Sequence, residues 1–133
     1  MEQFIGVWRL LGWEMWEPGG PMTQPLDAAP RGYLIYTPGG HMAVQMMRPE
    51  RPLFTSGNRW SSAPEEVQAA YAGYNAYCGS FTVNAAEGYV SHHLECSLYP
   101  NRVGTELRRT YTFTGNQLIL ATPDSRMTWE RAE

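Results

Sequence analysis

Three strands in succession can be read in the stretch Glu106–Arg131, ELRRTYTFTGNQLILATPDSRMTWER. Apolar and polar residues alternate in its first part, as in a β-strand with one buried face. Gly115-Asn116 and Pro123-Asp124-Ser125 then interrupt the pattern with residues typical of tight turns. The stretch therefore predicts antiparallel strands over residues 106–114, 117–122 and 126–131, joined by hairpin turns.

The rest of the chain contains five more candidate strands. Glycine- and proline-containing loops separate them, and Pro38-Gly39-Gly40 is a typical hairpin turn. Ser62 precedes Pro64 and Glu65 in the manner of a helix N-cap, so one short helix is expected from there to about Tyr77. The predicted strands are Gly6–Trp16, Arg31–Thr37, His41–Arg48, Gly79–Asn84 and Tyr89–Leu98.

The order of these strands favours a closed barrel. Eight sequential antiparallel strands close most naturally into an up-and-down barrel, which removes the sheet edges and can enclose one small ligand. A β-sandwich is the competing arrangement. With 133 residues, 43% of them hydrophobic, the chain has the length and the core of a single domain over residues 1–133. The predicted fold is all-β, an eight-stranded antiparallel up-and-down barrel with one short helix.

Composition and motifs exclude several classes of function. The net charge is −3 without any basic run, which argues against a nucleic acid or an anionic membrane as the partner. The chain has no lysine, so it cannot form a Schiff base. No nucleotide-binding, zinc-binding or nucleophile-elbow motif occurs, so neither a cofactor nor a metal is expected. With no membrane-length apolar segment and no signal-peptide pattern, the expected location is the cytoplasm, and a homodimer remains open.

Alternation along the late strands predicts which side chains face the barrel interior. In Tyr89–Leu98 the apolar side chains share one face with His92, and His93 points to the other. In Glu106–Thr114 the apolar side chains share their face with Arg109. Neighbouring histidines on a strand cannot bind one metal ion, because their side chains point in opposite directions.

An inward arginine is costly unless it is paired or solvated. By the same alternation Glu14 shares a face with Trp8 and Trp16, and it is the expected interior partner of Arg109. Two interpretations stay open. The pair closes the barrel only, or Arg109 anchors a carboxylate, enolate or carbonyl of a ligand, with His92 as hydrogen-bond partner or acid–base group.

A set of inward side chains is therefore expected to contact a ligand. If the protein is an enzyme, His92 and Arg109 are the candidate catalytic residues, and a tyrosine hydroxyl would donate a hydrogen bond to the substrate. The candidate ligand-binding residues are Glu14, Tyr36, Met46, His92, Arg109, Tyr111 and Trp129.

The two cysteines, Cys78 and Cys96, are expected on neighbouring strands joined by the turn Ala85–Gly88, which puts them near each other. A register with Phe81 opposite His92 places the cysteines on opposite faces, whereas a bulge at Gly88 would bring them together. In the cytoplasm two thiols are expected rather than a disulfide.

Several sequence blocks resemble the bacterial and fungal lipocalin-like domain family, and together they span essentially the whole chain. The start, Gly6-Val7-Trp8-Arg9-Leu10, resembles the G-x-W opening of lipocalins and related calycin barrels. The blocks GYLIYTPGGHM (residues 32–42) and VSHHLECSLYPN (residues 90–101), followed by Gly104-Thr105-Glu106 and Arg109, resemble signatures of the family. The resemblance implies an eight-stranded barrel with a central cavity for a small, mainly apolar molecule.

The resemblance also implies how the barrel is closed. In lipocalins the tryptophan of G-x-W seals the base of the barrel beneath an arginine from a late strand. Trp8 matches that tryptophan, and Arg131 is the first equivalent of the arginine, with Arg109 as the second. This packing is structural rather than catalytic.

Two functions follow as expectations, from different classes. The first is a protein that binds a small, mainly hydrophobic molecule in the barrel cavity. The alternative is a cofactor-independent cyclase or isomerase, which would hold a polyketide- or terpenoid-like natural-product intermediate in one reactive conformation. A third, purely structural barrel would have an interior filled by its own side chains.

Overall fold

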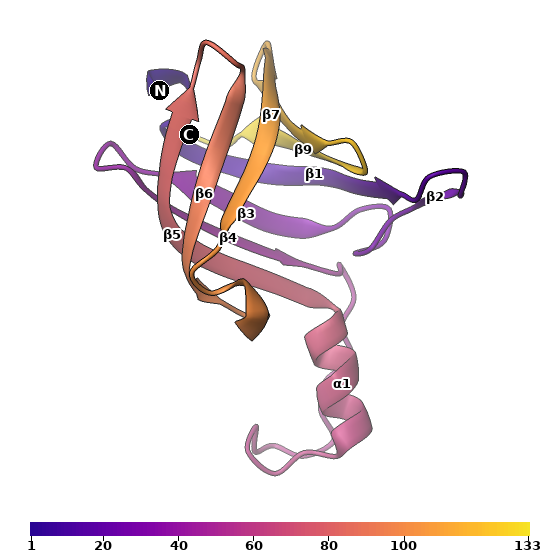
Figure 1. The fold of residues 1–133 in the computed structure, drawn as a ribbon. Coiled ribbons are helices and arrows are strands. Elements are labelled where there is room, and N and C mark those ends of the chain that lie inside the picture. Colours follow the sequence, from indigo (N-terminus) through magenta and orange to yellow (C-terminus); the bar gives the residue numbers. More distant parts are fainter.

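The computed structural model describes residues 1–133, and its main feature is a ring of eight antiparallel strands (Figure 1). Each strand pairs with the next along the chain, and the last pairs with the first, so the sheet closes on itself. The predicted all-β, eight-stranded barrel is therefore confirmed. Its strands are β1 (Gly6–Trp16), β3 (Arg31–Tyr36), β4 (His41–Met47), β5 (Tyr74–Asn84), β6 (Tyr89–Ser97), β7 (Glu106–Thr114), β8 (Gln117–Thr122) and β9 (Ser125–Arg131).

The segment expected to be a loop after β1 contains a ninth, very short strand. This strand, β2 (Met22–Thr23), folds back on the end of β1 with Trp16 opposite Met22. Two 3₁₀ turns, Glu2–Phe4 and Pro100–Arg102, complete the regular structure. None of the helices has the length and apolar character needed to cross a bilayer.

The helix is shorter than expected. It is α1 (Pro64–Ala72), with Ala63 as N-cap, because the Ser62 hydroxyl instead donates to a carbonyl in the preceding loop. Gly73 ends it, and the residues up to Tyr77 belong to β5 rather than to the helix. None of its residues is buried, and Figure 1 shows it projecting from the end of the barrel that lies opposite the two termini.

Aromatic side chains close the barrel at the end near the termini. Phe4, 1% exposed, inserts from the N-terminal 3₁₀ turn and makes edge-to-face contacts with Tyr111 and Phe113. Trp8 donates its indole N–H to the Phe4 carbonyl at 2.9 Å. The guanidinium carbon of Arg131 lies 4.1 Å from the centre of the Trp8 ring, so this end is sealed by a cation–π contact over a buried tryptophan.

The position of Glu14 differs from the predicted one, because β1 contains a bulge. The pairing of β1 with β9 skips Leu11, so the alternation of faces shifts by one residue beyond that point. Trp13 consequently faces inward, opposite Met127, whereas Glu14 faces outward and bonds to Arg126 at 2.8 Å. Glu14 is therefore not an interior partner of Arg109, because a single extra residue reverses which side chains point inward.

A second bulge decides the position of the cysteines. Phe81 is opposite His92 as predicted, but an extra residue at Glu95 shifts the register, and Cys78 lies directly opposite Cys96. The two thiols share the outer face of the barrel and are not joined in a disulfide. Neither anticipated arrangement is correct in full, since the bulge that brings the cysteines together is in β6 rather than at Gly88.

Candidate functional site

The open end of the barrel leads into a cavity of about 580 Å³. Its wall is mainly apolar and combines inward side chains of the strands with the loop residue Leu26 and the end of α1 at Tyr71. The inward strand residues that line it include Trp13, Met46, Asn75, Tyr77, Leu107, Arg109, Ser125 and Met127.

Between the cavity and the sealed end, a histidine is held by two tyrosines. The Tyr36 hydroxyl oxygen lies 2.6 Å from Nε2 of His92, and the Tyr77 hydroxyl oxygen lies 3.1 Å from Nδ1. His92 is 1% exposed and does not line the cavity, whereas Tyr77 does. Both ring nitrogens are therefore occupied by protein groups.

Burial determines the protonation states of His92 and Tyr36. Desolvation, followed by the positive charge of Arg109 and by His93, lowers the pKa of His92 from 6.5 to about 3. Burial and the neighbouring Tyr77 raise the pKa of Tyr36 well above 10.0, against the opposite effect of Arg109. At neutral pH the imidazole is uncharged and the Tyr36 phenol is protonated.

Arg109 enters the barrel because it occupies an inward position of β7, as the alternation predicts. Its Nε atom is buried without a hydrogen-bond partner, and the ion pairs of the structure join other arginines. Arg109 and its inward neighbour Leu107 are only half-buried, although both point to the interior. The interior is thus hollow beside β7, in contrast to a barrel filled by its own side chains.

The structure places the predicted site residues in different parts of the barrel. Met46 and Arg109 line the cavity, while Tyr36 and His92 bond to each other behind it. Tyr111 packs against the aromatic plug at the sealed end, and Trp129 is a core residue with 1% exposure. Glu14 lies outside the barrel. No group of three or more histidine, cysteine, aspartate or glutamate side chains is arranged to bind a metal ion.

Several cavity residues with polar groups were missed by the sequence reasoning, among them Trp13 and Tyr77. Trp13 is brought inside only by the bulge in β1, which nothing in the local pattern except Gly12 indicates. Tyr77 was assigned to the end of the helix, although the alternation of Tyr77, Gly79 and Phe81 with polar residues could have placed it on a strand.

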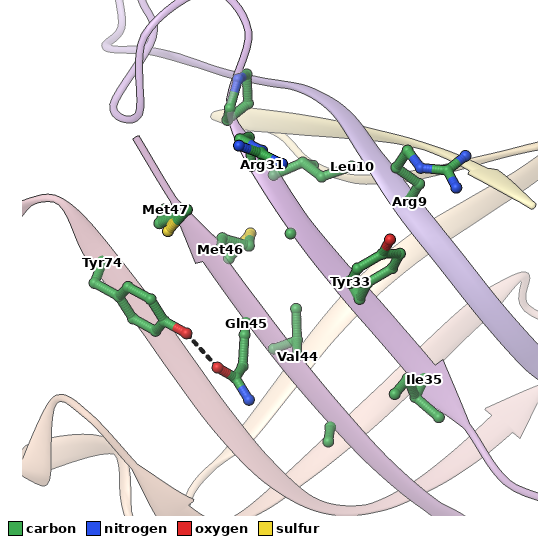
Figure 2. A pocket seen from close by; sticks show the side chains of 13 residues that line it. Arg9, Leu10, Arg31, Tyr33, Ile35, Val44, Gln45, Met46, Met47 and Tyr74 are labelled. Atoms are coloured by element: carbon green, nitrogen blue, oxygen red, sulfur yellow. Dashed lines mark hydrogen bonds between the residues drawn. The ribbon is translucent and has the colours of Figure 1, made fainter. Parts of the chain in front are cut away.

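A second hollow, of about 520 Å³, lies mainly over outward side chains of β1, β3 and β4 (Figure 2). Most of its polar side chains have partners on the protein, and its one unpaired arginine, Arg31, is exposed to solvent. Arg9 pairs with Glu130 at 3.8 Å and lies over the ring of Tyr33. The Tyr74 hydroxyl donates to the side-chain oxygen of Gln45 (Figure 2). The cavity inside the barrel, with its inward-facing and half-buried unpaired arginine, is therefore the stronger candidate site.

Comparison with known proteins agrees with this architecture. The model of the lipocalin-like domain family matches residues 5–132. The 4'-hydroxy-3'-methoxypropiophenone carrier protein ppsC of Aspergillus oryzae is 36% identical over 87 residues, in an alignment that covers 61% of this chain and 78% of that protein. The crystal structure of an uncharacterized protein from Bacteroides eggerthii has the same fold, with a TM-score of 0.53 over 96% of this chain and 98% of the other, at 13% identity. The chain therefore belongs to the lipocalin-like domain family.

Proposed function

We propose that this protein binds and carries a small, mainly hydrophobic molecule in the cavity of the barrel. The observation that carries the proposal is the hollow interior itself, about 580 Å³ with a largely apolar wall. Pockets for small organic molecules in proteins typically measure about 300–1,000 Å³ and combine apolar walls with a few polar groups. Trp13, Tyr77 and Arg109 supply such polar groups here.

The similarity to the carrier protein ppsC supports the same proposal. The name of that relative describes a carrier of an aryl ketone, whose aromatic ring bears a hydroxyl and a methoxy group beside a short acyl chain. A molecule of this class has the size and apolar character that the cavity accepts. We therefore expect a ligand with an aromatic or similarly flat apolar body.

A direct test uses prodan, a fluorescent naphthalene that carries a propionyl group and is a neutral aryl ketone. Titration of the protein into prodan should give saturable binding with a blue-shifted emission. Leu107→Trp adds bulk at an inward, half-buried position and should weaken the binding at least about tenfold. The matched control Thr112→Trp adds the same indole to the outward face of the same strand and should leave the affinity unchanged.

Absence of saturable binding, or equal binding by the two tryptophan variants, would overturn the proposal. If prodan binds as expected, the natural ligand can be sought by native mass spectrometry of protein from its own source. A stoichiometric extra mass of a few hundred daltons, absent after denaturation, would identify the carried molecule.

A cofactor-independent cyclase or isomerase is the second candidate function, because an unpaired arginine in an apolar cavity suits the stabilisation of a developing oxyanion. His92 is a weak candidate for the proton transfer that such a reaction needs. Both of its ring nitrogens are bonded to tyrosines, and it does not line the cavity. We therefore assign His92 the role of positioning Tyr36 and Tyr77, and we rank binding above catalysis.

A further inference from the structure

We propose that the ligand is an amphipathic anion, a flat apolar body carrying one carboxylate or comparably acidic oxygen, and that this oxygen is held by Arg109, Tyr77 and Trp13. The inference rests on the proposed function and adds the chemical class of the ligand. It follows from the direction of the hydrogen bonds around the cavity.

The Tyr36 hydroxyl determines which nitrogen of His92 carries the proton. Tyr36 is 1% exposed, and its hydroxyl bonds only to Nε2 of His92. A buried O–H that donates to nothing is costly, so the hydroxyl of Tyr36 donates and Nε2 accepts. A neutral imidazole has one acceptor and one donor nitrogen, so the proton of His92 is on Nδ1. The N–H of Nδ1 then donates to the Tyr77 oxygen.

The proton on Nδ1 of His92 in turn determines the direction of the Tyr77 hydroxyl. Its oxygen already accepts from His92, and its own O–H has no other partner in the protein. Tyr77 lines the cavity, so this O–H is available to a ligand. The buried Tyr36–His92 pair thereby makes Tyr77 a hydrogen-bond donor toward the cavity.

Two further donors in the cavity wall also lack partners. The indole Nε1 of Trp13 and the guanidinium Nε of Arg109 are buried and make no hydrogen bond. Neither group can accept a hydrogen bond. Three residues from β1, β5 and β7 therefore present only donors, and a molecule that occupies the cavity satisfies them only with an acceptor oxygen.

The charge of the cavity makes the preferred acceptor an anion. Arg109 has no carboxylate partner, and neither His92 nor Tyr36 carries a compensating charge. A ligand that displaces water from this guanidinium has to replace its hydration, and a carboxylate does so with charge-assisted, bidentate bonds. The only carboxylate in the lining is Asp124, an exposed residue in the turn before β9, and Asn75 offers a neutral amide.

Four naphthalenes that differ only in one substituent test the inference. They are 2-naphthoate, an anion; 2-acetonaphthone, a neutral acceptor; 2-ethylnaphthalene, without a polar group; and 2-(aminomethyl)naphthalene, a cation. Dissociation constants are measured by quenching of tryptophan fluorescence and by calorimetry. We expect 2-naphthoate to bind at least about tenfold more tightly than 2-ethylnaphthalene, with the ketone between them and the cation weakest.

Variants of the cavity residues then show which side chain causes the preference for the anion. Arg109→Met should remove the advantage of 2-naphthoate over 2-ethylnaphthalene. Tyr77→Phe should weaken 2-naphthoate and the ketone by a smaller factor. Arg102→Met is the matched control, because Arg102 lies exposed at the rim of the same cavity and should have little effect. Near-ultraviolet circular dichroism verifies that each variant keeps the native packing.

The outcomes separate this inference from the function on which it rests. If 2-ethylnaphthalene binds and 2-naphthoate has no advantage in the unmodified protein, the anionic class is wrong while small-molecule binding stands. The same conclusion follows if Arg109→Met keeps the full advantage of 2-naphthoate. If none of the four compounds binds, the proposed function fails, and the inference fails with it.

Discussion

The hydroxyl oxygen of Tyr36 lies 2.6 Å from Nε2 of His92, and this bond joins β3 to β6 across the barrel interior. The two strands are not neighbours in the sheet, so the contact is made by side chains alone. It lies between the aromatic plug and the cavity, where it holds Tyr77 from the other side of the imidazole. A buried network of polar side chains stabilises the fold only while each of its polar atoms is hydrogen-bonded.

Removal of the Tyr36 hydroxyl should therefore destabilise the fold. Tyr36→Phe leaves Nε2 of His92 buried without a partner, and we expect a loss of about 1–3 kcal/mol in the free energy of unfolding. Urea denaturation monitored by circular dichroism measures it. Tyr33→Phe is the control on the same strand, because Tyr33 points outward and is 50% exposed, so its loss should stay within about 0.5 kcal/mol. Equal effects of the two changes would contradict the role assigned to this bond.

The free energy of unfolding should decrease by about 2 kcal/mol between about pH 7 and about pH 5 through His92 alone. The pKa of His92 is about 3 in the folded protein, against 6.5 for the unperturbed group. In this window the unfolded chain binds a proton that the folded protein does not, so stability is fully present above the unfolded pKa and is lost as the pH falls. His92→Gln should be less stable overall and show a flatter pH dependence. Urea titrations at several pH values compare the two proteins, and parallel curves would count against the buried, neutral imidazole.

The contact of Arg131 with Trp8 should contribute measurably to stability. The guanidinium lies over the indole and also donates to the Ile5 carbonyl at 2.9 Å. We expect Arg131→Met to cost about 1–3 kcal/mol. Arg126→Met removes an arginine from the same strand that pairs with Glu14 at the surface, and it should cost less than about 1 kcal/mol. Chemical denaturation of both variants decides the matter, and an equally small loss in both would show that Arg131 is dispensable for closing the barrel.

Cys78 and Cys96 should form an intrachain disulfide when an oxidant is supplied. They are directly opposite on neighbouring strands, at a separation that the geometry of a disulfide accommodates. Diamide takes up the two thiol hydrogens, so oxidation should remove both thiols from titration with Ellman's reagent and lower the mass by two hydrogens without dimer formation. Burial and the Cys96 thiol raise the pKa of Cys78, so the reaction should be faster at alkaline pH. Cys96→Ser is the control, and disulfide-linked dimers of the unmodified chain would argue against the pairing.

Much of the barrel follows from local patterns in the sequence. The turns at Gly115-Asn116 and Pro38-Gly39-Gly40 separate segments whose alternation identifies strands. In the uninterrupted part of β6 and in β7 the same alternation places His92 and Arg109 inside, and the structure agrees. These features could be predicted because a strand without irregularities places successive side chains on opposite faces.

The tertiary structure decided what lies beyond each irregularity. A bulge adds one residue to one strand, so every side chain after it changes face, and the cause is the fit of the strand to its neighbour rather than its own sequence. For this reason Glu14 lies outside the barrel, Trp13 lies inside it, and Cys96 lies opposite Cys78. The sequence by itself determined a closed barrel with an arginine and a histidine inside. Only the packing of distant strands determined that the histidine is sealed between two tyrosines and that the arginine faces the cavity without a partner.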